Sequence, residues 1–333
     1  MTRPLVSVVT LAYNQAPYIA RCIEGALMQK TDIPFEVVIG EDCSTDGTRD
    51  IVLDYARKYP ELIKTITSDS NVGMAANAAR TFQACQGNYL AVCEGDDYWI
   101  DPLKLQKQYD AAVKYDAVLV VHGTIFLHYD GSKLIGASVR EAKEHAGFLS
   151  AEDVIFGLKS FHTSSLFIRA DLLPSMRALK WSTEGGDSTL KLRAVSQGKI
   201  YYLHEIMSIR QEGLSGSWTE TRVNRQRTAE HWRADYERSH LGMLLEFDAY
   251  TKHQYASLIR RRICDRLVRY FERNRDLDLL ETTSLAKATL RALARVAPIL
   301  PGKLRGPAVR RLVARSWDSS KLKRELEDAG SPS

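Results

Sequence analysis

Residues 89–99 read YLAVCEGDDYW, a short apolar run that ends in three carboxylates and two aromatic side chains. The run has the composition of a buried strand, whereas Glu94, Asp96 and Asp97 repel one another and are costly to bury. A divalent cation would neutralise them, since carboxylate oxygens are the ligands that Mg²⁺ and Mn²⁺ prefer. A solvated acidic turn leading into a helix also fits. The stretch therefore predicts a strand that ends either in a metal site or in an exposed turn.

Strand-like and helical segments alternate through the first hundred residues. Parallel strands joined by helices form a sheet that is covered on both faces, and such sheets bind ligands beyond the carboxyl ends of their strands. Polar residues gather at three of these ends, in 10–14, 41–48 and 94–97. The sequence therefore predicts an α/β fold with its site at this edge. We expect strands at Leu5–Leu11, Phe35–Gly40, Leu62–Thr67 and Tyr89–Cys93, and helices at Pro17–Gln29, Asp46–Tyr59 and Gly73–Ala84.

The rest of the chain divides into two unlike parts. From about Thr219 the pattern is helical and basic, so that residues 219–333 carry a net charge of +9 and residues 1–218 a net charge of −4. Unlike charge indicates different roles, and we expect an α/β domain in 1–218 and a separate helical region in 219–333. Within the first part we expect helices at 101–115 and Asp187–Gln197, strands at Ala117–Phe126 and Ser164–Ile168, and two short strands within Lys199–Arg210.

Composition narrows the class of protein. Of the 333 residues, 44% are hydrophobic and 26% charged, as in an ordinary soluble protein. No apolar run reaches the roughly 18 to 20 residues that span a bilayer, and the first residues read as a strand and not as a signal peptide. The five cysteines are scattered, with no CxxC pair. This argues against a disulfide framework or a zinc site and favours a cytoplasmic location.

Several motifs carry a family resemblance. SVVTLAYNQAPYI at 7–19, VIGEDCSTDGT at 38–48 and residues 71–99, which end in EGDDYW, resemble family 2 glycosyltransferases in order and spacing. The resemblance continues through TSSLFIR, GGDSTLKLRAVSQGKIYYLHEIMSIR and EGLSGSW, and so covers roughly 1–218. It implies the GT-A fold, a Rossmann-like and mostly parallel sheet with helices on both faces, here followed by an α-helical extension. It also implies a nucleotide-diphosphate sugar donor and inversion at the anomeric carbon.

The resemblance assigns donor-binding residues one by one. Thr10, Tyr13 and Asn14 match the loop that packs against the base, and Asp42 matches the aspartate that hydrogen-bonds the base, which favours a UDP-sugar. Glu94 matches the residue that contacts the ribose or the metal. Two further residues lie on the helix expected at Gly73–Ala84. Asn77 is expected to line the nucleotide pocket, and Arg80 to meet the diphosphate or to face solvent.

The resemblance also assigns the metal and the catalytic base. EGDD matches the DxD-type motif, with Asp96 as a ligand of Mn²⁺ or Mg²⁺ and Glu94 as its companion. Glu212 stands where some relatives carry a histidine that serves as a third metal contact. Asp187 matches the general base that takes the acceptor proton, although an aspartate here also suits a helix N-cap. The usual Glu-Asp pair is reduced, because Gly186 precedes Asp187.

Two functions remain open from the sequence. The QxxRW signature of processive synthases is missing, so we expect transfer of one sugar to a glycan or lipid-linked acceptor in surface polysaccharide biosynthesis. The alternative is a catalytically impaired module that binds nucleotide sugars. A nucleotidyltransferase needs a glycine-rich loop after the first strand, and TLAYNQAP is not one.

The basic C-terminal region has two interpretations. Lys287, Arg291 and Arg295 recur every four residues beside leucines, a pattern typical of docking on an anionic membrane surface. On this reading residues 258–317 hold the protein peripherally at the inner face of the cell membrane. On the other reading the helices form an ordinary subdomain packed on the α/β domain. No nucleic-acid-binding motif accompanies the charge, and we expect no nucleic acid partner.

Overall fold

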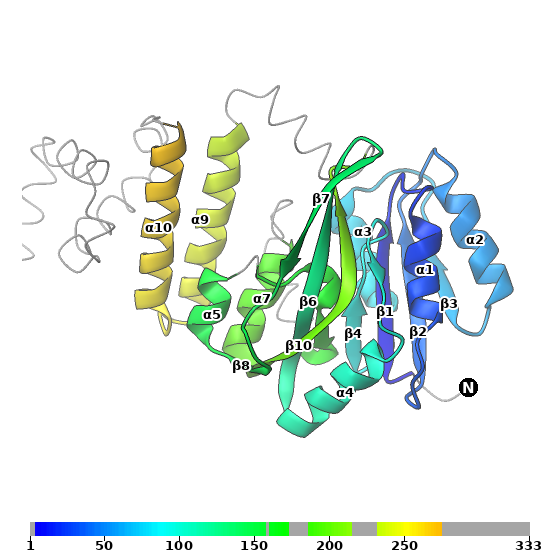
Figure 1. Cartoon of the computed structure of the whole chain (residues 1–333), viewed down its shortest axis with the longest axis horizontal. Helices are drawn as coiled ribbons and strands as arrows, with labels where there is room; N and C mark the ends of the chain where they lie inside the picture. The colour runs from blue at the N-terminus through cyan, green and yellow to red at the C-terminus, as the bar shows by residue number, and fades with distance from the viewer. Residues whose placement is uncertain (1–3, 158–159, 173–185, 215–231, 275–333) are drawn as a thin grey trace, which may run out of the picture. The chain divides into compact units, whose positions relative to one another are not determined.

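The computed structural model describes residues 4–157, 160–172, 186–214 and 232–274 (Figure 1). The chain divides into two compact units, Met1–Glu230 and His231–Ser333. The boundary expected at 218/219 lies outside the described residues, and its position therefore stays a prediction. Lys287, Arg291 and Arg295 also lie outside them.

The first half of the sheet is parallel. β1 (Val6–Ala12), β2 (Phe35–Glu41), β3 (Ile63–Ile66) and β4 (Tyr89–Val92) lie in the order β3-β2-β1-β4. They alternate along the chain with α1 (Ile19–Leu27), α2 (Thr48–Lys58) and α3 (Met74–Ala84). The alternation expected from the sequence is confirmed, and the carboxyl ends of β1, β2 and β4 meet at one edge (Figure 1).

Strand periodicity explains how the helices cover both faces. Val8, Val37 and Ile39 lie in one buried cluster with Ile23 of α1. Because side chains alternate along a strand, Gly40 faces the other side of β2, where α3 lies. A Cβ on Gly40 would stand 1.9 Å from Thr81 Oγ1. The close approach of α3 therefore requires glycine at this position.

The second half of the sheet is mixed. β9 (Phe167–Arg169) runs antiparallel between β4 and β6 (Ala117–Asp130), and β6 pairs in parallel with β10 (Lys199–Glu212). Two expectations were wrong. Lys199–Glu212 forms one strand, with bulges near Leu203 and Ile206, in place of two short strands. The strand expected at Ser164–Ile168 begins only at Phe167, because Thr163–Ser165 forms a 3₁₀ turn, η1, in which Ser165 N–H donates to His162 O. α4 (Lys104–Tyr115) and α7 (Gly186–Gln197) fall at expected places.

Several short elements had no clear sequence signal. The strands among them complete one ten-stranded sheet within the described residues, in which β5 and β8 pair with β10 and β7 pairs with β6. The short elements are β5 (Tyr98–Trp99), β7 (Lys133–Arg140), β8 (Gly147–Leu149), α5 (Ala151–Phe156) and a 3₁₀ turn, η2 (Ala170–Leu172).

The described part of the second unit is a helical hairpin. α9 (Trp232–Tyr250) packs against α10 (Ala256–Asn274). Ile259, Ile263 and Leu267 of α10 are buried, and Arg266 forms an ion pair with Glu237 of α9 at 2.8 Å. These three apolar side chains are therefore covered by protein. No helix among the described residues is both long and apolar enough to cross a bilayer.

Candidate active site

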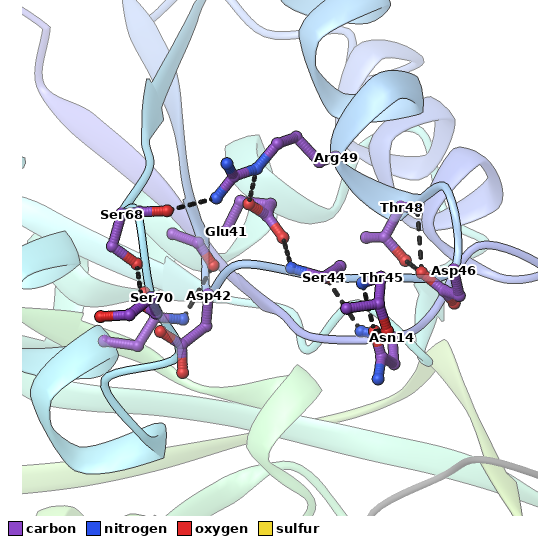
Figure 2. Close-up of polar contacts among 12 residues, drawn as sticks. Asn14, Glu41, Asp42, Ser44, Thr45, Asp46, Thr48, Arg49, Ser68 and Ser70 are labelled. Carbon is purple, nitrogen blue, oxygen red and sulfur yellow. Dashed lines mark hydrogen bonds and ion pairs between the residues drawn. The ribbon is translucent and has the colours of Figure 1, made fainter.

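The loops after β1 and β2 are joined by a hydrogen-bonded network (Figure 2). Asn14 N–H donates to Ser44 Oγ at 3.0 Å, and Thr45 N–H donates to Asn14 Oδ1 at 2.9 Å. Asn14 and Cys43 both have positive φ, 51° and 58°, a conformation that asparagine tolerates better than most residues. This arrangement, called here the loop network, fixes the first two polar strand ends relative to each other.

Glu41 is the buried anion of the loop network. Its side chain accepts from Ser44 N–H and from Arg49 Nε, each at 2.6 Å (Figure 2). Burial acts to raise the pKa of Glu41, but the bonds from Ser44 and Arg49 outweigh it and lower the pKa. Arg49 also donates to Ser68 O at 2.5 Å. The carboxylate of Glu41 is therefore fully paired by the protein itself.

Most residues expected to touch the nucleotide are engaged by protein groups. Asp42 accepts from the N–H groups of Val72 and Gly73, both at 2.9 Å. Asn77 Nδ2 donates to Gly40 O at 2.9 Å. These contacts hold the segment before α3 against the end of β2.

The remaining residues of this set differ in exposure. Arg80 donates from Nη2 to Glu41 O at 2.7 Å and from Nε to Asn77 Oδ1 at 2.9 Å. Thr10 is buried with its Oγ1 3.8 Å from Cys22 Sγ. Tyr13, in contrast, is 45% exposed and presents an aromatic ring on which a base could stack. The direct roles assigned to these residues stay predictions.

A second group of polar side chains follows β4. One carboxylate oxygen each of Glu94 and Asp97 and one ring nitrogen of His162 lie within 4.8 Å of one another. Asp97 is 2% exposed and His162 7%. His162 comes from the segment before η1, which β9 holds beside β4. We call these three residues the carboxylate–histidine cluster.

The contacts of this cluster fit a metal ion. Ser164 N–H donates to His162 Nδ1 at 3.3 Å, which makes this nitrogen an acceptor in that contact. Burial, followed by Arg210 and Lys191, lowers the pKa of His162 well below 6.5 and so favours the neutral ring. Asp97 Oδ2 lies 3.2 Å from the same nitrogen, and no hydrogen-bond donor reaches it within the described residues. Two acceptors face each other here, and a proton or a cation must separate them.

The charge at the cluster supports the same conclusion. Burial, followed by repulsion from Asp96, raises the pKa of Glu94 to about 7. Burial, followed by Asp96 and Glu94, also raises the pKa of Asp97 well above its ordinary value. These carboxyl groups therefore favour protons when no cation is bound, which is the behaviour of an acidic site built for a divalent ion.

The cluster differs from the ligand set expected from the sequence. Glu94 belongs to both sets. Asp96 is outside the cluster, and its backbone carbonyl accepts from Gln211 Nε2 at 2.9 Å. Glu212 lies 3.3 Å from His128 Nδ1 and 3.7 Å from Arg210 Nη2. Asp96 and Glu212 stay predicted ligands, while geometry adds Asp97 and His162.

Asp187 lies in the first turn of α7 and is 37% exposed. Its Oδ2 accepts from Lys191 Nζ at 2.8 Å, and this buried lysine also donates to Phe161 O at 2.9 Å. Burial acts to raise the pKa of Asp187, but Lys191 outweighs it and lowers the pKa to about 2. The carboxylate is thus ionised at neutral pH and held in one orientation by Lys191, and its role as the general base stays a prediction.

Sequence reasoning missed two members of the cluster as ligands. Asp97 belongs to the EGDD motif, where only Glu94 and Asp96 were assigned. His162 immediately precedes the TSSLFIR motif, and its position beside that motif was the available signal. Its approach to Asp97 depends on how β9 enters the sheet.

The fold and the polar strand ends define an α/β protein of the class that binds ligands beyond the carboxyl ends of its parallel strands. Residues 7–167 match the family model described as Glycosyl transferase family 2. Through this domain the chain belongs to glycosyl transferase family 2.

Sequence relatives agree with this family. The uncharacterized protein Rv1520 of Mycobacterium tuberculosis is 34% identical over 227 residues, which are 67% of this chain and 63% of that protein. The chain thus matches less than two thirds of this relative. The putative teichuronic acid biosynthesis glycosyltransferase TuaG of Bacillus subtilis is 35% identical over 132 residues, 40% of this chain and 51% of TuaG.

Solved structures confirm the GT-A fold. The S. aureus TarS 1–349 structure in complex with UDP has a TM-score of 0.61 at 18% identity and covers 98% of this chain and 93% of its own. Mannosyltransferase PcManGT from Pyrobaculum calidifontis, in complex with GDP-Man and Mn²⁺, has a TM-score of 0.52 at 16% identity and covers 98% and 84%.

Proposed function

We propose that this protein is a metal-dependent, inverting glycosyltransferase that moves one sugar from a UDP-sugar to an acceptor hydroxyl. The observation that carries the proposal is the carboxylate–histidine cluster, which contains two facing acceptors at the strand edge of a family 2 domain. UDP is favoured as the nucleotide because TarS, a structural neighbour, is solved with UDP and with UDP-GlcNAc.

The proposed role of each residue follows from its position in the site. Tyr13 and the loop network form the nucleotide side, and Glu94, Asp97 and His162 would hold Mn²⁺ or Mg²⁺, with Asp96 and Glu212 as further predicted ligands. A cation bound there would neutralise the charge that develops on the leaving diphosphate. Asp187 would accept the proton of the acceptor hydroxyl through the oxygen not bound to Lys191.

We further propose that the acceptor is a glycan or a lipid-linked glycan in surface polysaccharide biosynthesis, as the name of TuaG suggests for that relative. The protein would act in the cytoplasm, in keeping with its five free cysteines. Residues 1–218 would form the catalytic domain and residues 219–333 a second domain. Since Ile259, Ile263 and Leu267 of α10 are buried, attachment to an anionic membrane through 258–317 would depend on charges or on other residues of this range.

A panel of nucleotide sugars tests the proposal. Donor hydrolysis should require Mn²⁺ or Mg²⁺ and should stop in chelator. Binding of UDP without turnover of any donor would favour the alternative, a module that binds nucleotide sugars and has lost catalysis. Absence of nucleotide binding would contradict both.

A further inference from the structure

A buried lysine links the candidate base to the segment that carries the histidine of the carboxylate–histidine cluster. Lys191 stands one turn after Asp187 on α7, and its side chain is 1% exposed. Its Nζ donates to Asp187 Oδ2 at 2.8 Å and to the backbone carbonyl of Phe161 at 2.9 Å. Phe161 directly precedes His162 in the chain. One ammonium group therefore bonds to both parts of the candidate site.

The surroundings of Lys191 restrict where its ammonium group can lie. A buried lysine loses the hydration of its charge and much of the rotamer freedom of its long stem. Nζ of Lys191 lies 4.9 Å from the centroid of the Phe161 ring, which is itself buried, and α7 packs against α5, β6 and β10. The two oxygens that accept from this ammonium group are therefore held at fixed places relative to each other.

Each of these oxygens leads to a group that is expected to take part in the reaction. Because Oδ2 of Asp187 is engaged, Oδ1 is the oxygen that can take a proton. It lies 3.5 Å from Ser188 Oγ, a distance at which a hydrogen bond is weak. On the other side, His162 continues from Phe161 into η1, and its Nδ1 lies 3.2 Å from Asp97 Oδ2. A shift of Phe161 O would therefore also move His162 relative to Asp97.

We propose that Lys191 is a positioning residue that sets the proton-accepting oxygen of Asp187 relative to the cation held by the carboxylate–histidine cluster. This inference rests on the proposed function, which supplies the base and the cation. In an inverting transfer the acceptor oxygen attacks the anomeric carbon opposite the leaving diphosphate. The base and the cation must therefore stand at a fixed separation, and small errors in such a separation are costly to the rate. Lys191 acts through Asp187 and Phe161, without contact to the substrate.

Loss of the ammonium group should weaken two measurable properties together. In Lys191→Met we expect kcat for sugar transfer and the affinity for Mn²⁺ each to fall about 10- to 100-fold, the usual effect of removing a partner that orients a metal ligand. The donor KM at saturating Mn²⁺ should change little. The affinity for Mn²⁺ is obtained from melting temperatures without donor, and so does not depend on activity. Asp187→Asn should lower kcat alone, because the bond from Lys191 to Phe161 O remains.

A double variant and a pH profile separate positioning from a general structural role. If Lys191 acts on catalysis through Asp187, adding Lys191→Met to Asp187→Asn should slow transfer little further. In Lys191→Met the pKa of Asp187 should rise, because Lys191 no longer opposes burial. At saturating Mn²⁺ the low-pH limb of kcat should then move to higher pH. His162 and Glu94 also interact with Asp187 and are the same in both proteins.

A second buried lysine provides the matched control. Lys104 is equally buried, but it bonds to Gln108 on α4, and Lys104→Met should leave kcat and Mn²⁺ affinity unchanged. Lys191→Gln, which retains an uncharged donor, should be intermediate and replaces Lys191→Met if that variant does not fold.

Two results would overturn the inference while the proposed function stands. One is that kcat and Mn²⁺ affinity do not both fall when Lys191 is changed, and the other is that Lys104→Met causes the same losses. If Mn²⁺ binds to the unmodified protein but no donor is turned over, the proposed function fails. An unchanged Mn²⁺ affinity in Lys191→Met would then still overturn the link from Lys191 to the cluster.

Discussion

The loop network and the carboxylate–histidine cluster occupy the same edge of the sheet but treat buried carboxylates in opposite ways. Glu41 receives bonds from Ser44 and Arg49, which lower its pKa. Asp97 faces another acceptor, and burial raises its pKa. The carboxylate of the first region is paired by protein groups, whereas no hydrogen-bond donor among the described residues reaches Asp97 Oδ2 in the second. An ion-binding site can thus be recognised by what its buried acceptors lack.

The largest expected effect concerns catalysis. Asp187→Asn should lower the rate of sugar transfer by about 10²- to 10⁴-fold, because it removes a positioned general base, and should change donor affinity little. Initial rates and donor affinity are measured together. Ser196→Ala, on the same helix, serves as the control. A parallel loss of donor affinity would make Asp187 a binding residue instead.

The next prediction removes the centre of the cluster. In the unmodified protein saturating Mn²⁺ should raise stability, by about 2.7 kcal/mol at one hundred times its Kd, and Asp97→Asn should abolish this rise. The melting temperature is measured with Mn²⁺ and with chelator, and Asp54→Asn on α2 is the control. If Asp96→Asn and Glu212→Gln abolish the rise and Asp97→Asn does not, the ligand set expected from the sequence holds instead.

A buried lysine behind the carboxylate turn gives a pH test. Lys104 is fully buried, its Nζ lies 3.8 Å from the centroid of the Trp99 ring, and burial lowers its pKa from 10.5 to about 7. Between these values the unfolded chain binds more protons than the folded protein, so the contribution of Lys104 to stability rises with pH across this window. Relative to Lys104→Met, the free energy of unfolding should gain a few kcal/mol from pH 7 to 10. If the free energy of unfolding, measured in urea, changes equally with pH in the two proteins, Lys104 does not titrate between pH 7 and 10.

The smallest expected effect comes from a direct comparison of Glu41 in the loop network with Asp97 in the carboxylate–histidine cluster. Glu41→Gln should destabilise the protein by about 2 kcal/mol, because it weakens two charge-assisted bonds. Asp97→Asn in chelator should instead be neutral or stabilising, since it removes a buried carboxyl group whose Oδ2 is reached by no donor among the described residues. Urea unfolding gives both values, with the exposed Glu61→Gln as a reference. Equal losses in the two variants would contradict the comparison.

Sequence patterns predict the parallel half of the fold well. β1, β2 and β4 are mostly apolar runs followed by polar residues, and this pattern is typical of a buried strand. β7 escapes prediction because it lies at an edge and exposes Leu134 and Ile135. Its only strand partner among the described residues is β6. Apolar and polar residues alternate along a strand when one of its faces is buried, and β7 has no such buried face.

The candidate site is predictable only where function is carried by a continuous motif. Glu94 and Asp187 stand in motifs that the family resemblance identifies. His162 meets Asp97 through the antiparallel pairing of β9 with β4, and the register of such a pairing is a tertiary property. The sequence names the chemistry of each side chain, but it does not contain the distances between them.

Gln211 has a consequence for how substitutions would affect the candidate site. It donates to the backbone carbonyl of Asp96, and β5, which follows the carboxylate turn, pairs with β10 at Ser208 and Ile209. β10 and the carboxylate turn are therefore held together, and a substitution that shifts β10 should also shift the carboxylates. β7 has only β6 as a strand partner among the described residues, so substitutions at its exposed Leu134 and Ile135 should disturb the carboxylate turn less than substitutions on β10.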